Sequence, residues 1–195
     1  PCMVCELCRR GAYTNCPQFK KTRLYPAGIA EYVRVPREIV AGDVLKLPDH
    51  LPYEAGSLIE PIACCVRALD RARVQGGDSV VIVGAGFNGV VLALLAPHWN
   101  ADKVAVLDRV PSRLARAESL GIQTFNVDSE DWQAQVLAWT GGYGAGVVIV
   151  TPSKTPVIQQ SLALVAPGGT LMMYGPPAPD DRLALDANYT FFKEI

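Results

Sequence analysis

The feature that most constrains this chain is a glycine-rich segment, residues 84–89, with the spacing Gly-x-Gly-x-x-Gly. It directly follows Ser79–Val83, a run of mostly β-branched residues that predicts a buried strand. It also opens a helical pattern over residues 88–96, which Pro97 closes. A strand, a glycine turn and a helix in this order predict the start of a βαβ unit.

Each glycine of this segment has its own predicted role. Gly84 permits the tight turn, Gly86 lets a pyrophosphate approach the backbone, and Gly89 lets the helix pack closely on the strand. Phe87 precedes the predicted helix and Asn88 begins it, and the free N–H groups and positive dipole end of this helix start favour phosphate. The segment therefore predicts dinucleotide binding. The alternative is an α/β domain without a nucleotide, in which the glycines serve only turns.

An acidic residue follows the next predicted strand, Lys103–Leu107. Asp108 lies about twenty residues beyond the glycine segment, where a carboxylate accepts hydrogen bonds from the adenosine ribose. It would repel a 2′-phosphate, so we expect NAD rather than NADP. Arg109 weakens that choice because it could bind a phosphate. Arg113, in the following helix, is the last residue that we assign to the cofactor site.

The segments from residue 79 onward alternate between strands that are apolar on both faces and helices. This alternation predicts an α/β fold, a doubly wound parallel sheet of the Rossmann type covered by helices on both sides. The further strands are predicted at 124–127, 147–150 and 170–174, and the further helices at 112–120, 132–139 and 157–165. Ahead of them, residues 53–74 are predicted helical, residues 29–35 a strand, and residues 36–51 loops and short extended pieces.

Four cysteines lie within the first sixteen residues, at Cys2, Cys5, Cys8 and Cys16. Four thiolates in so short a segment can surround a tetrahedral ion, and an all-thiolate site leaves no open coordination position. We therefore predict a structural zinc ion. Five basic residues would offset the negative charge of the site and donate hydrogen bonds near its sulfurs. They are Arg9, Arg10, Lys20, Lys21 and Arg23.

Three other interpretations of this cluster remain open. An iron–sulfur site is disfavoured because three residues, not seven, precede the last cysteine of that pattern. A zinc knuckle that binds nucleic acid is disfavoured because only Tyr13 and Phe19 supply aromatic rings. Disulfides are disfavoured because the cysteines are too close together to tie distant segments. Cys64 and Cys65 are interpreted as small buried side chains rather than ligands, with one of them facing the core.

The composition narrows the class of protein. A net charge of −1 gives no general attraction to nucleic acid or to an anionic membrane. The longest apolar stretch, Val90–Ala96, is far too short to span a bilayer, and no signal segment is visible. Clustered cysteines without such a segment favour a reducing, cytoplasmic location. The chain begins at Pro1, which indicates processing or a longer parent protein.

Taken together, these residues resemble the zinc-dependent medium-chain dehydrogenase/reductase family, near the sorbitol and threonine dehydrogenases. The matching text is Pro1–Gly11 with Asn15-Cys16, then Gly28–Pro36, Leu58–Ile62, Gly77-Asp78, Gly84–Gly89 and Pro167–Gly169. The resemblance implies part of a GroES-like, β-rich catalytic domain with the structural zinc lobe over residues 1–60. It implies a Rossmann NAD-binding domain, incomplete at its C-terminus, over residues 61–195.

The resemblance also implies what this chain lacks. The family's catalytic zinc takes a cysteine and a His-Glu pair from a segment before the zinc lobe, and its sixth strand would follow Ile195. We therefore expect a fragment that is inactive by itself. Glu60 lies where sorbitol-dehydrogenase-like members place an acid near the catalytic zinc, although an ordinary helix cap would explain it too.

For the whole protein, the resemblance implies hydride transfer between an alcohol or polyol and NAD, in a homo-oligomer. The alternative is a noncatalytic NAD-binding module with a structural zinc site. Three positions depart from the family pattern: Asn88 replaces an apolar residue, Gly146 replaces an acid, and residues 151–153 differ beside the expected nicotinamide site. The specific substrate is not predicted.

Overall fold

The computed structural model describes all residues, Pro1–Ile195, and the chain forms two compact units. The first comprises Pro1–Gly56 and the second Ser57–Ile195. The assignment of the first unit to a GroES-like domain remains a prediction. None of the helices in either unit has the length and hydropathy that crossing a bilayer requires.

The second unit contains a five-stranded sheet with the order β3-β2-β1-β4-β5, in which every pairing is parallel. Its strands are β1 (Ser79–Val83), β2 (Lys103–Asp108), β3 (Gln123–Asn126), β4 (Ala145–Val150) and β5 (Val165–Met173). The chain therefore moves outward from β1 to β3, returns to β4 beside β1, and continues to β5. The Rossmann-type parallel fold predicted from the sequence is confirmed.

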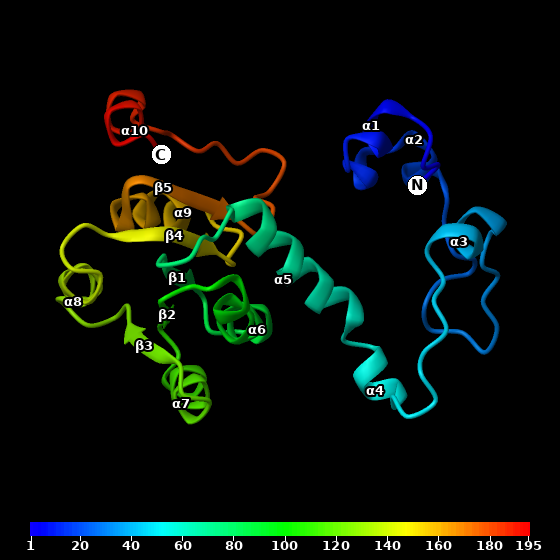
Figure 1. Ribbon diagram of the computed structural model, residues 1–195, viewed down its shortest axis with the longest axis horizontal. Helices are drawn as coiled ribbons and strands as arrows, with labels where there is room; N and C mark the ends of the chain where they lie inside the picture. Colours follow the sequence, from blue (N-terminus) through cyan, green and yellow to red (C-terminus); the bar gives the residue numbers. More distant parts are fainter. The chain divides into compact units, whose positions relative to one another are not determined.

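Helices cover both faces of this sheet (Figure 1). On one face lie α5 (Ile59–Ala72), α6 (Phe87–Leu95) with the 3₁₀ turn Ala96–Trp99, and α7 (Pro111–Ser119). On the other lie α8 (Trp132–Trp139) and α9 (Thr155–Ser161) with the 3₁₀ turn Leu162–Leu164. A last helix, α10 (Ala187–Lys193), is capped by Asp186, whose carboxylate accepts a 3.0 Å hydrogen bond from the Tyr189 N–H.

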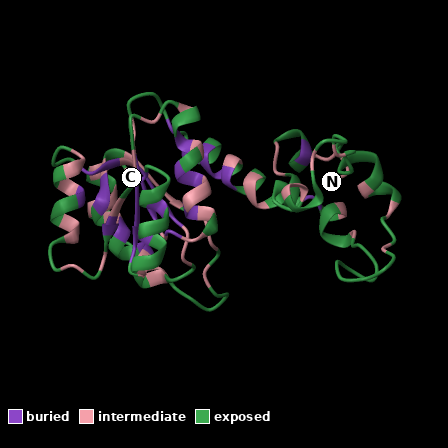
Figure 2. Ribbon diagram, turned by 90° about the horizontal axis from the view of Figure 1, so that it is seen from below, coloured by how far each residue is buried: buried purple, intermediate pink, exposed green.

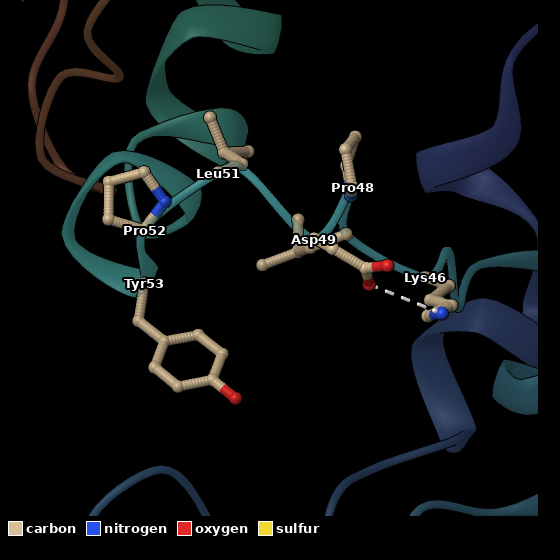
Figure 3. A pocket seen from close by; sticks show the side chains of 7 residues that line it. Lys46, Pro48, Asp49, Leu51, Pro52 and Tyr53 are labelled. Carbon is tan, nitrogen blue, oxygen red and sulfur yellow. Dashed lines mark ion pairs between the residues drawn. The ribbon is translucent and has the colours of Figure 1, made fainter.

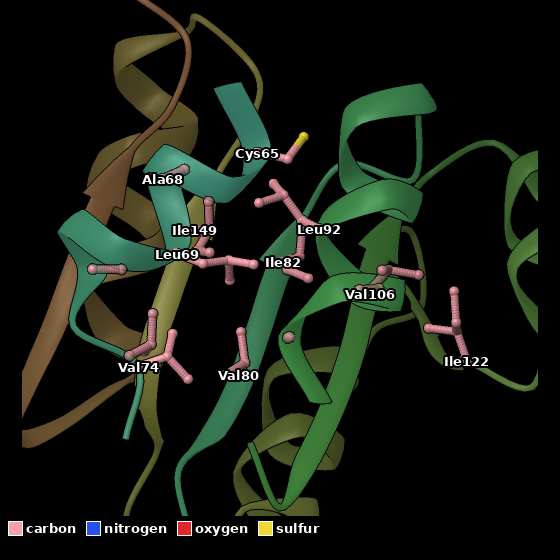
Figure 4. Close-up of a cluster of buried hydrophobic side chains, with 14 of the residues drawn as sticks. Cys65, Ala68, Leu69, Val74, Val80, Ile82, Leu92, Val106, Ile122 and Ile149 are labelled. Carbon is pink, nitrogen blue, oxygen red and sulfur yellow. The ribbon is translucent and has the colours of Figure 1, made fainter. Parts of the chain in front are cut away.

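Alternate residues of each central strand enter different cores. Val80 and Ile82 of β1 pack with α5 and α6, and Figure 4 shows Leu69 and Leu92 against them. Val81 enters the opposite core, which is closed by α8 and α9. This division explains why the strand is apolar at every position after Ser79, as a sheet covered on both faces requires.

The second unit follows the sequence prediction closely. Strand β1 has the predicted bounds, and the other strands and helices α5 to α9 overlap their predicted positions. Helix α10 was not predicted from the sequence. Among the predicted elements, the largest difference is in β5, which begins at Val165 rather than 170. Its register against β4 shifts between Ala145 and Val147, and Gly168 has a φ of +73°. The sequence around Pro167 concealed this early part of the strand because its Pro-Gly-Gly text is typical of a turn.

The first unit has short helices and no strand. They are α1 (Glu6–Arg9), the 3₁₀ turn Tyr13–Asn15, α2 (Pro17–Lys21), α3 (Arg37–Gly42) and α4 (Tyr53–Gly56). The strand predicted at 29–35 is wrong: the only pairing is an isolated antiparallel bridge between Tyr25 and Arg34. Ile29 and Tyr32 are fully or almost fully exposed. The alternation of apolar and polar residues predicted the two faces of a strand, but no neighbouring backbone is present to pair with it.

The loops predicted at 36–51 are also partly wrong, because residues 37–42 form α3. Pro36 immediately precedes the first residue of this helix, where its fixed φ is compatible with a helix start. The sequence pattern had instead predicted that Pro36 interrupts regular structure. Figure 2 shows that burial is concentrated in the sheet of the second unit. In the first unit the only fully buried residues are Cys8 and Cys16.

Candidate functional site

A pocket of about 450 Å³ opens at the carboxyl ends of the central strands. Its lining joins β1, β2 and β4 at Val83, Asp108 and Thr151. Strands β1 and β4 are neighbours, but the chain continues from β1 to β2 on one side and from β4 to β5 on the other. The strand order therefore reverses between them, which makes this place a topological switch point. Such a switch point, outside the carboxyl ends of parallel strands, is where open α/β sheets bind ligands. The complete lining is Val83, Gly84, Gly86, Leu107, Asp108, Arg109, Val110, Arg113, Val127, Thr151, Pro152 and Val157.

The three glycines of the segment have different surroundings. Gly84 has a φ of +99°, and a Cβ there would collide with the Thr151 hydroxyl. A Cβ at Gly89 would collide with the Gly84 carbonyl, so the helix approaches the turn too closely for a side chain. At Gly86, no atom lies within 4 Å of the Cβ position. Gly84 and Gly89 are therefore required by packing, whereas the space at Gly86 faces the pocket.

Helix α6 begins at this turn with Gly86 as its N-cap and without a side-chain cap. The first N–H groups of such a helix have no intrahelical partner and, together with the dipole, form an anion-binding end. Asn88, in the first turn, has a buried Oδ1 without a hydrogen-bond partner, and its carbonyl lies 3.7 Å from the Cys65 sulfur. The polar residue at this unusual position thus lies in the region where α6 packs on α5.

Asp108 is buried, with 8% of its surface exposed. Its Oδ2 accepts a 2.7 Å hydrogen bond from the Ala85 N–H inside the glycine segment. Its Oδ1 accepts hydrogen bonds from the N–H groups of Arg109 and Val110, at 2.8 and 2.9 Å. The carboxylate therefore connects the glycine turn to the end of β2. This connection was not foreseen from the sequence, which assigned Asp108 only to the ribose.

The two arginines assigned to the cofactor both border the pocket, and each is paired with a carboxylate. Arg113 Nη1 lies 3.6 Å from Asp108 Oδ2. Arg109 Nη2 lies 3.1 Å from Oδ1 of Asp128, a residue that follows β3. Asp128 was not predicted as a site residue, although its position just beyond a predicted parallel strand could have indicated it. Phe87 is half-exposed and does not line the pocket.

Two unusual positions now have a physical explanation. The Thr151 hydroxyl donates a 2.8 Å hydrogen bond to the Val83 carbonyl, which ties the end of β4 to the turn after β1. A Cβ at Gly146 would lie only 2.5 Å from Oδ1 of Asp78. The acid expected at residue 146 would therefore collide with, and repel, the carboxylate that already occupies this place.

The four predicted metal ligands come together in the first unit. All four cysteine sulfurs lie within 4.8 Å of one another, and the Cys2–Cys8 and Cys5–Cys16 pairs are each 4.0 Å apart. A tetrahedral zinc ion with Zn–S bonds of about 2.3 Å separates its sulfurs by about 3.8 Å, so the donor set fits zinc. None of these cysteines forms a disulfide.

Backbone N–H groups stabilise the thiolate form of part of this cluster. The Cys5 N–H donates to the Cys2 sulfur at 3.3 Å, and the Cys2 N–H donates to the Cys16 sulfur at 3.4 Å. Backbone donors, led by Phe19, lower the pKa of Cys16 to about 6, and those led by Val4 lower the pKa of Cys2. Burial instead raises the pKa of Cys8 to about 11.

The five basic residues were predicted to donate hydrogen bonds near the sulfurs, and none of them donates to a sulfur itself. Arg10 Nη1 lies 3.7 Å from Glu6 Oε1, and Arg23 donates to the carbonyls of Phe19 and Thr22. The turns of the chain already aim backbone N–H groups at the sulfurs, so these side chains remain at the surface. Their charge can still offset that of a zinc tetrathiolate over a longer range.

Glu60 lies in the first turn of α5, which has no side-chain cap. Its Oε1 accepts a 3.3 Å hydrogen bond from Cys64, and this bond raises the pKa of the thiol. Cys65 is buried in the core, as predicted for one of the pair. The prediction that Cys64 is buried too is wrong, because the next position around α5 faces away from that core and its side chain is exposed. Glu60 and Cys64 are not joined by a third metal-ligand side chain, because the only group of three or more such residues is that of the four cysteines.

A second hollow, of about 520 Å³, lies in the first unit along the loop from Lys46 to Tyr53 (Figure 3). Its only ion pair joins Lys46 Nζ to Asp49 Oδ1 at 3.4 Å, and both side chains are almost fully exposed. A single loop forms the hollow without converging buried polar groups. It therefore has none of the features of the pocket beside Asp108.

Comparisons with known proteins agree with this geometry. The family profile described as "Zinc-binding dehydrogenase" matches residues 89–195. Sorbitol dehydrogenase of Bacillus subtilis is 30% identical over 92% of this chain, and erythritol/L-threitol dehydrogenase of Mycolicibacterium smegmatis is 31% identical over 90%. The structure of alcohol dehydrogenase TADH from Thermus sp. ATN1 is 27% identical, with a TM-score of 0.86 over 99% of this chain.

This chain spans about half the length of those curated relatives, 51% and 49%, and 57% of the Thermus chain.

Proposed function

Because this chain belongs to the zinc-binding dehydrogenase family, we propose that it binds NAD and that the whole protein is an oxidoreductase acting on an alcohol or polyol. The pocket at the switch point of the sheet is the observation that carries this proposal. There, an open glycine turn, the N-terminus of α6 and a buried carboxylate border one cavity. This combination suits a dinucleotide because each part addresses a different portion of the ligand.

The residues of the pocket divide the binding of the cofactor among them. Gly86 and the first N–H groups of α6 would hold the pyrophosphate, since the backbone there is open. Asp108 would hold the ribose while it keeps the glycine turn against β2. Thr151, at the end of β4, would border the nicotinamide half. When bound, NAD supplies the hydride acceptor, and a catalytic zinc would polarise the substrate oxygen.

We further propose that Cys2, Cys5, Cys8 and Cys16 hold a structural zinc ion. Four mutually close sulfurs leave no position for a substrate, so this ion would maintain the fold of the lobe. Glu60 remains a candidate ligand for the catalytic zinc of the whole protein, because its carboxylate lies at an exposed helix start. The substrate class and assembly into a homo-oligomer are proposals from the family and from the relatives' names.

The sharpest test of NAD binding exchanges one glycine for alanine. Gly86 has an ordinary φ of −74° and open space around its Cβ position, so Gly86→Ala should fold normally. The new methyl would occupy the approach of the pyrophosphate and should weaken NADH binding at least about tenfold. NADH fluorescence titration of the zinc-loaded chain measures this effect, and thermal unfolding checks the fold.

The neighbouring Gly89→Ala is the matched control. Its methyl would collide with the Gly84 carbonyl, so the variant should lose stability, by about 1–3 kcal/mol, before binding is considered. The contrast separates a ligand contact from a packing requirement. Absence of NADH uptake by the folded, zinc-loaded wild-type chain would contradict the proposed function, and equal binding by wild type and Gly86→Ala would contradict the assigned pyrophosphate position.

A further inference from the structure

The charges beside the pocket form two separate pairs. Arg113 lies against Asp108, and Arg109 lies against Asp128 at a closer 3.1 Å. Asp108 is fixed in position, because its oxygens also accept three backbone hydrogen bonds and hold the glycine turn. Asp128 forms no hydrogen bond with the glycine turn. It is the only carboxylate that pairs with Arg109.

The sheet itself brings Arg109 and Asp128 together. Strands β2 and β3 run parallel with Asp108 opposite Asn126, so the residues just beyond each strand leave the same edge. The Asn126 side chain accepts a 2.9 Å hydrogen bond from the Asp128 N–H and fixes the start of this loop. Val127, which lies between Asn126 and Asp128 in the chain, lines the pocket. Asp128 is therefore positioned by the fold beside the end of the pocket where Asp108 lies.

On the basis of the proposed function, we propose that Asp128 is a specificity-determining residue that makes this chain prefer NAD to NADP. Its carboxylate neutralises Arg109 and withholds that guanidinium from a 2′-phosphate. Arginine binds phosphate through a planar fork of donors, so a free Arg109 would favour the phosphorylated cofactor. Preference for NAD thus depends on a residue outside β2 and outside the glycine segment.

The test compares NADH and NADPH binding by wild type, Asp128→Asn and Glu130→Gln. Glu130 lies in the same loop, is exposed and forms no ion pair, so its variant removes the same charge without releasing Arg109. Asp128→Asn should strengthen NADPH binding roughly five- to tenfold and leave NADH binding within about twofold. Glu130→Gln should leave the ratio of the two affinities unchanged. The NADPH gain should shrink at high salt, because both partners are partly exposed.

A second variant tests whether the effect passes through the arginine. In Asp128→Asn with Arg109→Gln, the gain in NADPH affinity should disappear, whereas a general change in loop structure would persist. The inference is wrong if Asp128→Asn changes the NADPH-to-NADH ratio no more than Glu130→Gln does, or if the wild-type chain already prefers NADPH. Failure of the wild-type chain to bind either dinucleotide would instead overturn the proposed function.

Discussion

The two units of this chain are held together in different ways. Residues 57–195 bury a cluster of apolar side chains on each face of a sheet, including Ile82 and Ile149 on one face and Val148 on the other. Residues 1–56 fully bury only Cys8 and Cys16. A short segment without an apolar core needs another source of folding free energy. From this comparison we infer that zinc bound by the cysteine cluster would take the place of a hydrophobic core in the first unit.

The largest expected effect comes from removing the metal. Stripping zinc with a chelator, or replacing Cys16 by serine, should abolish the amide hydrogen-exchange protection of residues 1–56 and leave the protection of the sheet unchanged. The reason is that zinc binding and folding of such a lobe are one process. The control is Cys64→Ser, which alters an exposed cysteine outside the cluster. Persistent protection of residues 1–56 without zinc would contradict the comparison.

A cavity in the core should have the opposite pattern. Ile149→Ala removes a fully buried side chain from the interior strand β4 and should lower the free energy of unfolding of residues 57–195 by about 2–5 kcal/mol. Zinc affinity should not change, because the cysteines lie in the other unit. Urea unfolding monitored by circular dichroism, together with competition for zinc, measures both quantities. A parallel loss of zinc affinity would show that the two units do not fold separately.

Acid should affect the first unit more than the second. Because the pKa of Cys8 is raised to about 11, zinc must displace its proton at neutral pH, whereas Cys16, with a pKa of about 6, is already mostly ionised. Apparent zinc affinity should therefore rise with pH, at least about tenfold per unit between pH 7 and 9. Below pH 6, protonation of Cys16 should steepen the loss. A zinc affinity independent of pH would argue against thiolate ligands.

The smallest effect is expected for a surface ion pair. Lys46→Ala breaks the contact between Lys46 and Asp49, whose side chains are 87% and 92% exposed. Because such pairs are well solvated, zinc affinity and thermal unfolding of the zinc-loaded chain should change by less than about 0.5 kcal/mol. A larger change would mean that residues 46–53 stabilise the first unit more than the high exposure of this ion pair indicates.

The sequence predicted most of the second unit because its local signals agree with its long-range packing. Ser79–Val83 is β-branched after its first residue and ends at a glycine turn, so the strand, the turn and the helix that follows support one another. In the first unit, the alternation at 29–35 had no strand beside it and formed no ladder. Hydrophobic alternation predicts which faces a strand would have, but not whether another backbone is available to pair with it.

The candidate sites divide in the same manner. The amino-acid sequence alone predicted that the four cysteines would gather and that a glycine turn would follow β1, because close spacing along the chain leaves few ways to arrange those residues. Only the tertiary structure decided that Asp108 holds the glycine turn, that Gly146 makes room for Asp78, and that Asp128 pairs with Arg109. These relations join residues on different strands, and their partners depend on the order and register of the sheet, which no local pattern records.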